Sequence, residues 1–219
     1  MRLGCITDLH GRLSALERIL VDAGPADAVL LGGDLTTFGS PGDAQRIVAL
    51  AQRHTATVLA VAGNCDSAAI DERLGHWGVG LHGRGIVCEA VGIHGLSAIP
   101  PWKRGMYQLT EEELAAALQT GHAAIHGAAQ HVLLAHVPPR GLKADRTFFW
   151  KHAGSTAVRE FVDRTQPALV LCGHIHEGRG IEGLGRTTVA NCGFAGHGDY
   201  AVADLNGDSI QVTLHTAHA

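Results

Sequence analysis

The sequence contains no apolar run that approaches the ~20 residues of a membrane-spanning helix. Its first residues, MRLGCITDLH, go directly into a strand-like pattern and lack the charged start and apolar core of a signal peptide. The five cysteines are scattered and have no CxxC spacing, which is typical of a reducing cytosol rather than of a disulfide framework. We therefore expect a cytoplasmic protein without a membrane partner.

An excess of charge of one sign is also missing. The net charge is −4, acids and bases are interspersed, and no basic block appears. These features argue against a nucleic-acid polymer as the main partner. The sequence has no linker-like or low-complexity stretch and no internal repeat, and 46% of its residues are apolar. Its 219 residues therefore predict one domain over residues 1–219.

Histidine is unusually abundant in the sequence. The chain has 15 histidines against 5 phenylalanines. The composition bias of a GC-rich genome would explain this number, since Ala, Gly, Arg and Val are also abundant. Metal binding is the other explanation, and only the positions of the histidines distinguish the two.

Short apolar runs that end near Gly, Asp or His recur along the chain. They cover residues 2–7, 27–33, 57–63, 85–95, 131–136, 168–174, 187–193 and 200–205. The runs are continuous rather than alternating, which is typical of strands that are buried on both faces.

Helical patterns lie between several of these strands, over residues 12–24, 40–54, 110–121 and 154–167. Ser40 and Pro41 suit the N-cap and first helical position, and Thr110 with Glu113 forms a capping-box pattern. A further helix is expected to start at Ser67. The alternation of strands and helices predicts an α/β fold.

Polar residues of the metal-binding type follow five of the expected strands. In chain order they are Asp8 and His10, then Asp34, then Asn64-Cys65-Asp66, then His136, then His174 and His176. Neither Lys nor Arg stands at these strand ends. In open α/β sheets, ligands bind beyond the carboxyl ends of the strands, where loops from several strands converge. We therefore expect these side chains to meet.

The spacing of these residues suits a metal site. In Asp8-x-His10 and His174-x-His176 the paired side chains share one face of an extended backbone. Mixed carboxylate and imidazole ligands suit manganese, iron, zinc, cobalt or nickel rather than magnesium or calcium alone. Glycines at 33, 63 and 173 allow sharp turns beside the site.

Each motif alone also has an ordinary explanation. Asp8 or Asp34 could end a strand in an Asx turn, and Asn64 could occupy a left-handed turn position. Asp66 could cap the next helix, and His136 could be a turn histidine before two prolines. The occurrence of all five motifs at strand ends favours a shared site.

Taken together, the motifs resemble the pattern of the calcineurin-like metallophosphoesterase superfamily: D-x-H, G-D, G-N-H-(D/E), an isolated His and G-H-x-H. The match runs from Arg2 to about Leu205, and HVPPRG, GSTAVREF and GHIHEGRG are similar to a compact prokaryotic branch of predicted phosphoesterases. The resemblance implies a four-layer α/β fold of two facing mixed β-sheets flanked by helices, with two divalent transition metals.

The resemblance also implies a ligand set. One metal would take Asp8, His10 and His176, the other would take Asn64, His136 and His174, and Asp34 would bridge both. We expect manganese, with iron, zinc, cobalt or nickel as alternatives. Metals about 3.5–4 Å apart would hold a phosphoryl group and deprotonate a bridging water, and the hydroxide would attack phosphorus in line. Asn64 would also orient the phosphate.

Cys65 departs from the family pattern, because many members have a histidine there that is thought to stabilise or protonate the departing oxygen. A thiol is a weak donor with a pKa near ~8.5 and replaces imidazole poorly as a general acid. A cysteine at this place also occurs in compact members that resemble phosphodiesterases. We therefore expect a preference for leaving groups that depart easily, or a proton supplied by water or the substrate. We also expect a preference for diesters, which carry one negative charge rather than two. Cys65 could instead be a packing residue, a thiolate ligand or a nucleophile.

Two irregular stretches, 95–105 and 138–154, flank the expected site. They carry basic residues beside aromatic ones, a combination that could hold phosphate and stack a base. The candidate substrate residues are Trp102, Arg104, Arg140, Arg146 and Trp150. Alternatively, the aromatic run 148–150 lies on the core or forms the contact of a homo-oligomer. The sequence does not place His94, His152 and His197, and it predicts a frayed tail around His215 and His218.

The expected function is hydrolysis of diesters in a small phosphorylated substrate, with a nucleotide as one option. The alternatives within enzymes are a phosphomonoesterase or nucleotidase and a nucleotide pyrophosphatase. A non-catalytic metal-binding scaffold is the alternative outside enzymes, because a retromer subunit shares this fold and serves as a protein-binding module. That subunit has lost metal ligands, whereas this sequence retains the full set.

Overall fold

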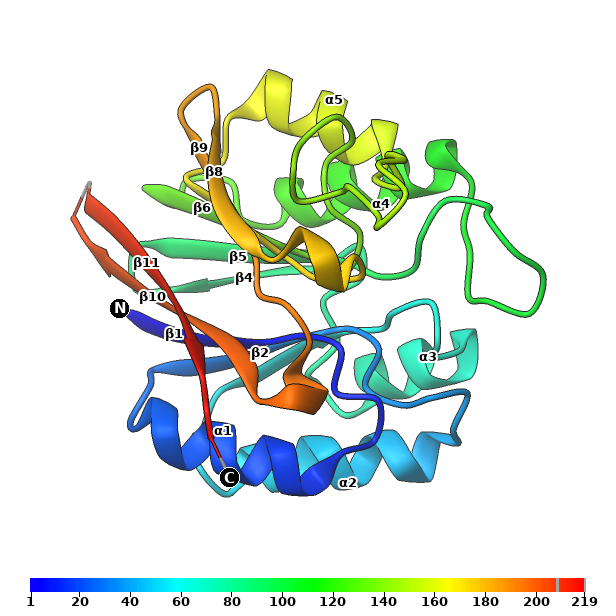
Figure 1. The fold of residues 1–219 in the computed structure, drawn as a ribbon. Coiled ribbons are helices and arrows are strands. Elements are labelled where there is room, and N and C mark those ends of the chain that lie inside the picture. Colours follow the sequence, from blue (N-terminus) through cyan, green and yellow to red (C-terminus); the bar gives the residue numbers. More distant parts are fainter. Residues whose placement is uncertain (208, 219) are drawn as a thin grey trace.

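The structure is a computed structural model that describes residues 1–207 and 209–218. In this part of the chain, a five-stranded and a six-stranded sheet face each other, and helices cover both outer faces (Figure 1). Both sheets contain parallel and antiparallel strands. The expected four-layer α/β fold of two facing mixed sheets is therefore confirmed.

The first sheet has the strand order β11-β10-β1-β2-β3. Three strands are parallel: β1 (Arg2–Ile6), β2 (Ala28–Gly32) and β3 (Val58–Val61). β10 (Asp199–Asn206) pairs antiparallel with β1, and β11 (Ser209–Thr216) pairs antiparallel with β10. The last strands of the described chain therefore lie beside the first.

The second sheet has the order β4-β5-β6-β7-β9-β8. Its central strands are parallel: β5 (Val91–Leu96), β6 (Gln130–Ala135), β7 (Leu169–Cys172) and β9 (Thr187–Asn191). The edge strands β4 (Gly85–Cys88) and β8 (Gly180–Leu184) run antiparallel to their neighbours.

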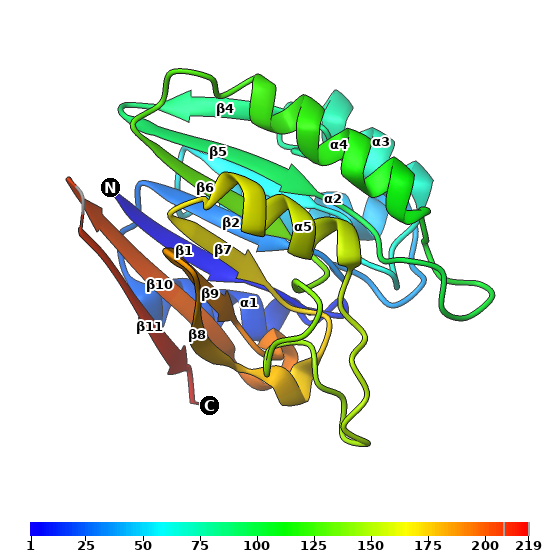
Figure 2. The ribbon, with the colours of Figure 1, turned by 90° about the horizontal axis from the view of Figure 1, so that it is seen from above.

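The helices form the two outer layers. α1 (Leu13–Ala23), α2 (Pro41–Gln52) and α3 (Ala68–His76) pack on the first sheet. α4 (Glu111–Ala123) and α5 (Thr156–Thr165) cover the second sheet, as Figure 2 shows from above. Single 3-10 turns follow β7 (His176–Gly178) and β9 (Ala195–His197). None of the helices in the described residues combines the length and apolar character that crossing a bilayer requires.

α2, α3 and α4 begin directly after the capping residues that the sequence predicted. The Ser40 and Thr110 side chains cap α2 and α4 in complete capping boxes. Ser67 caps α3, since its hydroxyl accepts a hydrogen bond from the Ile70 N–H at 3.3 Å. The alternative in which Asp66 caps this helix is therefore wrong.

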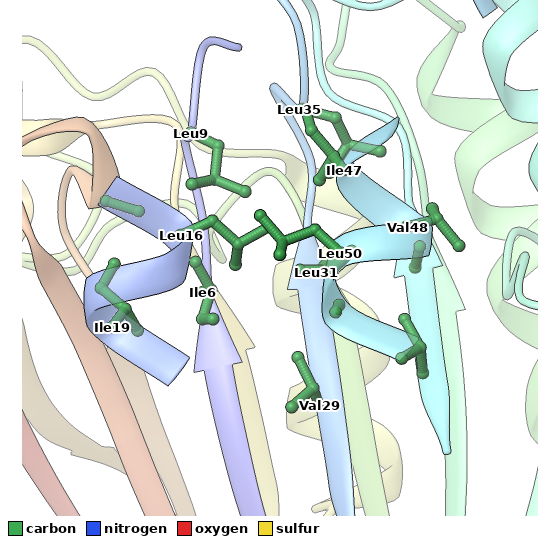
Figure 3. Close-up of a cluster of buried hydrophobic side chains, with 14 of the residues drawn as sticks. Ile6, Leu9, Leu16, Ile19, Val29, Leu31, Leu35, Ile47, Val48 and Leu50 are labelled. Carbon is green, nitrogen blue, oxygen red and sulfur yellow. The ribbon is translucent and has the colours of Figure 1, made fainter. Parts of the chain in front are cut away.

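Alternating side chains of the central strands supply two hydrophobic layers. In β2, Leu30 faces the second sheet, whereas Val29 and Leu31 face α1 and α2 (Figure 3). A strand with apolar neighbours on both faces needs a continuous apolar sequence. The continuous apolar runs of the sequence therefore predicted these strands correctly. Each fully buried leucine stabilises the fold by about 1.5–3 kcal/mol relative to an exposed one. A third layer joins the second sheet to α4 and α5.

The structure corrects three predictions at the sheet edges. Residues 85–95 form two strands, β4 and β5, which are separated by a turn with Glu89 at φ 56°. β8 and β11 were not predicted, because they are partly exposed and lack a continuous apolar run. His215 lies in β11 and stacks on Tyr200 with ring centroids 5.1 Å apart, so the predicted frayed tail is wrong there. His218 is exposed beyond that strand.

All five cysteines are free, as expected without a disulfide framework. Cys5 and Cys192 nevertheless meet between the two sheets, with their sulfur atoms 3.4 Å apart. The thiol of Cys192 donates to the sulfur of Cys5. This hydrogen bond and burial both raise the pKa of Cys5 well above its ordinary value, so the thiol stays neutral in the core.

His94 is a fully buried histidine outside the five strand-end motifs. It lies on β5, and its ring packs against Phe161 of α5 and His122 of α4. Neither ring nitrogen has a hydrogen-bond partner among the described residues. Burial lowers the pKa of His94 to about 3, so the side chain is neutral in the folded protein near neutral pH.

We predict that His94 weakens the fold in acid. Between pH 6.5 and about pH 3 the unfolded chain protonates this side chain and the folded chain does not. The free energy of unfolding then falls with falling pH, by up to about 1.4 kcal/mol per pH unit from this group. Urea unfolding at about pH 7 and about pH 4 should show a smaller acid loss for His94→Phe than for wild type. His126→Gln, an exposed change, should retain the wild-type loss. Equal losses in His94→Phe and wild type would contradict the prediction.

Candidate metal centre

The loops that follow β1, β2, β3, β6 and β7 meet at one edge of the stacked sheets. Their backbones are tied together, because the Asp8 N–H donates to Gly33 O at 3.0 Å and the His10 N–H donates to Asp34 O at 2.8 Å. The Gly173 N–H likewise donates to the carbonyl of His136 at 3.1 Å. The predicted strand-end residues are therefore brought together from both sheets.

Three sets of three side chains among the described residues have the spacing of metal ligands. Asp8, His10 and His176 each offer a ligand atom within 4.8 Å of the others, and so do Asp8, Asp34 and His136. The third set is His10, Asp34 and Cys65. The first set is the one expected for one metal. In the second, His136 Nε2 lies 3.5 Å from Asp34 Oδ1 and 3.0 Å from Asn64 Oδ1. The ring of His174 lies 5.2 Å from that of His136.

Four residues of the cluster have left-handed backbone conformations: Asp8 (φ 58°), His10 (φ 50°), Asp34 (φ 47°) and His174 (φ 66°). Such conformations cost non-glycine residues roughly 1–3 kcal/mol each, and they persist where the surroundings fix them. Here the interlocked backbone hydrogen bonds supply that constraint. A concentration of strained residues at one cluster is typical of a functional site.

The two aspartates do not form Asx turns with their own backbone. Asp8 Oδ2 accepts from the N–H of His174 at 3.0 Å, and Asp34 Oδ1 accepts from the N–H of Cys65 at 2.7 Å. Each carboxylate therefore reaches across to another loop. His136 is fully buried, with Nδ1 3.0 Å from the Gly32 carbonyl, and is no surface turn residue. These ordinary explanations of the motifs are wrong.

Asp66 lies behind the cluster and holds two of its loops. Its carboxylate accepts from the N–H groups of Gly63, Leu35 and Thr36 at 2.9, 3.0 and 2.9 Å. Burial raises its pKa, and the neighbouring Asp34 raises it further. Asp66 is thus a supporting residue of the loops that carry Asp34 and Asn64.

Asn191, at the end of β9, is a supporting residue that the sequence analysis missed. Its fully buried amide donates to the carbonyls of Ala144, Gly173 and Ile175, at 3.0, 3.3 and 2.8 Å. It therefore holds the loop that carries His174 and His176. Asn191 could have been found from its position at the end of an apolar strand, the criterion that identified the other candidate site residues.

Phe194 was also missed. Its ring stacks on His176 with centroids 4.6 Å apart and meets His10 edge-on at 5.6 Å. His197, which is exposed, contacts the same ring at 4.5 Å. Phe194 thus fixes the orientation of two imidazoles of the cluster, whereas His197 stands outside it.

The electrostatics of the cluster suit cations. Burial raises the pKa of Asp34. Burial would also raise that of Asp8, but His176, His136 and His174 together bring its pKa below the ordinary value. Burial and then His136 lower the pKa of His174 to about 3. His174 therefore offers neutral imidazole, which is the protonation state that metal ligation requires. For His176, burial is outweighed by the hydrogen bond to Asp8 and the charge of that carboxylate, which together raise the pKa.

Two buried atoms of the cluster are incompletely satisfied. Among the described residues, His174 Nε2 is buried and makes no hydrogen bond, and Asp8 Oδ1 has only an ion-pair contact, with His176 Nε2 at 3.2 Å. A buried carboxylate oxygen with one such contact and a buried imidazole nitrogen with none destabilise a fold unless something else satisfies them. Divalent cations would do so, and the oxygen and nitrogen donors fit them. The cluster, together with the family reported below, indicates divalent metal ions.

Cys65 lies at the edge of the cluster. Its sulfur accepts a hydrogen bond from the Asn64 amide at 3.2 Å and comes within 4.8 Å of ligand atoms of His10 and Asp34. A histidine is therefore close to Cys65, which the sequence did not show. Burial, and then Asp34, raise the pKa of the thiol well above its ordinary value. A neutral thiol is a poor nucleophile.

A pocket of about 600 Å³ adjoins the cluster. Both irregular stretches contribute to its wall, which includes Trp102, Arg140, Phe148, His152 and His174. The ring of Trp102 meets that of His174 edge-on at 5.7 Å. The pocket therefore opens beside the candidate metal ligands.

The candidate substrate residues divide into two groups. Trp102 and Arg140 line this pocket, whereas Arg104, Arg146 and Trp150 are not among its lining residues. The guanidinium of Arg146 instead lies over the ring of Trp150, 5.6 Å from its centroid. Phe148, Phe149 and Trp150 are 75%, 78% and 77% exposed, so the interpretation that they lie on the core is wrong.

Comparison with known proteins assigns the chain to a protein family. The profile of the calcineurin-like phosphoesterase family, Metallophos, matches residues 1–178. The uncharacterized protein MJ1162 of Methanocaldococcus jannaschii is 31% identical to this chain over 198 residues, which is 87% of each protein.

Solved structures share the fold. The protein TT1561 of Thermus thermophilus superposes with a TM-score of 0.73 at 19% identity, over 97% of each chain. A putative 5′-nucleotidase of Staphylococcus aureus gives a TM-score of 0.62 at 15% identity, over 99% of this chain and 54% of that one. At these identities the likeness concerns the fold.

We predict that Gly63 is required for the packing of the cluster. A Cβ at this position would overlap Asp34 Oδ1 and the Asp34 backbone nitrogen and would lie 2.7 Å from His136 Cε1. Gly63→Ala should therefore destabilise the metal-free protein by about 1–3 kcal/mol in urea unfolding. It should also weaken manganese binding in calorimetry. Gly183→Ala, whose Cβ would meet nothing within 4 Å, is the matched control. Equal stability of the two variants would contradict the prediction.

Proposed function

The chain belongs to the calcineurin-like phosphoesterase family, and from this premise we propose that it is a dinuclear metal-dependent phosphodiesterase. The family supports hydrolysis of phosphoesters. The observation that carries the proposal is the pair of ligand sets that share Asp8, a partly exposed one with His10 and His176 and a buried one with Asp34 and His136.

In this proposal Asp8, His10 and His176 hold one metal, and Asn64, His136 and His174 hold the other, with Asp34 between them. Two divalent ions there would supply a deprotonated water and neutralise charge on the phosphoryl oxygens. Asp66 and Asn191 keep the ligand loops in register through the backbone contacts described above. The Asn64 amide has a further role, which is to orient the phosphate.

The neutral thiol of Cys65 supports diesters as substrates. It lies beside Asp34 and Asn64, where many family members have a histidine, and its raised pKa makes it a weak proton donor. A monoester carries two negative charges and a diester carries one. A site without a cationic donor at this position therefore disfavours the monoester more.

We further propose manganese as the metal and a small phosphorylated molecule as the substrate. Mixed carboxylate, amide and imidazole donors suit manganese, and iron, zinc, cobalt and nickel are the alternatives. Trp102 and Phe148 beside Arg140 in the adjoining pocket would suit a nucleotide. The same pocket supports the second candidate function, a phosphomonoesterase that acts on nucleotides.

Metal removal tests the dinuclear site. Protein treated with a chelator should lose hydrolysis of bis-p-nitrophenyl phosphate, and manganese should restore it. Asp34→Asn should lower the restored kcat by at least about 100-fold, because the bridging charge is removed. Metal analysis should show fewer than two ions per chain in this variant. Asp163→Asn, an exposed change on α5, should retain both activity and metal. Full activity of Asp34→Asn would refute the ligand assignment.

Substitution of Cys65 tests the diester preference. Wild type should hydrolyse bis-p-nitrophenyl phosphate faster than p-nitrophenyl phosphate, a monoester with the same leaving group. Cys65→His should raise kcat/KM for phenyl phosphate by about tenfold or more, since imidazole adds a donor near the second charge. Cys88→His, on the edge strand β4, is the matched control and should change none of these rates. A wild-type preference for the monoester would instead favour the second candidate function.

A further inference from the structure

His152 and Asp145 form an ion pair in the wall of the pocket beside the metal centre. His152 Nδ1 lies 2.6 Å from Asp145 Oδ1. The aspartate side chain is fully buried, whereas the histidine side chain is 32% exposed. An exposed imidazole backed by a buried carboxylate is the arrangement that holds a catalytic histidine in a fixed orientation.

The loop around Asp145 makes this orientation rigid. The carboxylate accepts from the N–H groups of Gly141, Leu142 and Gly154 at 3.1, 3.0 and 3.1 Å. His152 Nδ1 donates to the same carboxylate. Because Nδ1 is thus engaged, Nε2 is the ring nitrogen free to serve a ligand in the pocket.

His152 shares this pocket with the candidate metal centre. His152 lines it together with His174, a proposed metal ligand, and with Trp102, whose ring contacts His174. A phosphoryl group at the metal centre would therefore direct one of its ester substituents into this pocket. That substituent would meet His152 on one side and the aromatic rings of Trp102 and Phe148 on another.

The two carboxylates of the wall, Glu111 and Glu177, are already engaged. Glu111 accepts hydrogen bonds from the Ser155 hydroxyl and from the N–H groups of Thr156 and Ala157, at 2.6, 2.8 and 2.9 Å. Although burial acts against it, these bonds lower the pKa of Glu111, so it is a carboxylate near neutral pH. Glu177 accepts from the Phe148 N–H at 3.3 Å. Arg140 does not give up a proton.

We propose that His152, oriented by Asp145, is the general acid that protonates the leaving group, and that the pocket is the leaving-group subsite. This inference rests on the proposed function and names its substrate class. A site with such an acid serves diesters of poor leaving groups, such as the hydroxyl of a nucleoside or another alcohol. It revises the expectation from Cys65 alone, which was a preference for leaving groups that depart easily.

The reaction balances as follows. Water attacks phosphorus and loses one proton to solvent, and the bond between phosphorus and the leaving oxygen breaks. The leaving oxygen takes the proton of His152 Nε2 and departs as the alcohol. His152 becomes neutral, with its Nδ1 proton still donated to Asp145, and regains a proton from solvent.

Leaving-group dependence tests this proposal. The substrates are bis-p-nitrophenyl phosphate, whose leaving group departs without a proton, and diphenyl phosphate, whose leaving group needs one. His152→Gln in the manganese-loaded protein should lose about 100-fold or more in kcat on diphenyl phosphate. It should stay within about threefold of wild type on bis-p-nitrophenyl phosphate, which also shows that the fold and metal site are intact.

Chemical rescue adds a readout that does not change if the role of His152 is merely structural. Added imidazole should restore His152→Ala on diphenyl phosphate. His197→Gln, the exposed histidine beside Phe194, is the matched control and should behave as wild type.

The outcomes separate this inference from the proposed function. If the wild type hydrolyses both diesters and His152→Gln loses neither, or loses both equally, His152 is not the acid and the phosphodiesterase proposal stands. If His197→Gln shows the selective loss instead, His197 is the acid and the inference is overturned. If the metal-loaded wild type hydrolyses neither diester, the proposed function fails and the inference fails with it.

Discussion

The arrangement of two buried carboxylates, Asp8 and Asp34, is the constraint on which the rest of the site depends. Both lie in left-handed loops, and each carboxylate accepts a hydrogen bond from the backbone of another loop. Two such charges destabilise a low-dielectric interior unless positive charge or donors surround them. The imidazoles of the cluster meet this need only in part, because Asp8 Oδ1 has a single contact, with the partly exposed His176 at 3.2 Å, and His174 Nε2 has no partner among the described residues. Binding of divalent cations would therefore stabilise the fold as well as supply the chemistry.

The stacking of the two sheets determines where these carboxylates meet. β1, β2 and β3 in one sheet and β5, β6 and β7 in the other are joined by the apolar layer that contains Leu30 and Leu134. That layer is rigid, because well-packed interiors have little free volume. The loops at its end therefore hold ligand atoms from both sheets within 4.8 Å of one another, although their residues are far apart in the sequence. The absence of a Cβ at Gly63 and Gly173 allows this approach, since a Cβ would overlap Asp34 or Asp8.

Much of this arrangement could be predicted because its signals are local. Continuous apolar runs identified the central strands, and the capping residues Ser40 and Thr110 identified two helix starts. Asp8, Asp34 and the histidines stood at the ends of predicted strands. The edge strands β8 and β11 were missed because half-exposed strands need no continuous apolar run. Asn191 and Phe194 were missed because their roles arise only from tertiary contacts, with the β7 loop and with His176. His152 could not be placed for the same reason, since its position depends on how the loop folds around Asp145.

The proposed position of the general acid, at His152 rather than at residue 65, has a consequence for substrate specificity. A general acid on the metal-bearing loop beside Asn64 would serve any phosphoester that reaches the metals. An acid on the loop that forms the pocket serves only an ester whose leaving group enters that pocket, next to Trp102 and Phe148. Binding of the leaving group and protonation of its oxygen then depend on the same contacts, so recognition acts on the transition state rather than on the bound substrate alone. The loss of an acid at position 65 would in this way restrict the enzyme to fewer substrates without lowering its rate on the ones that fit.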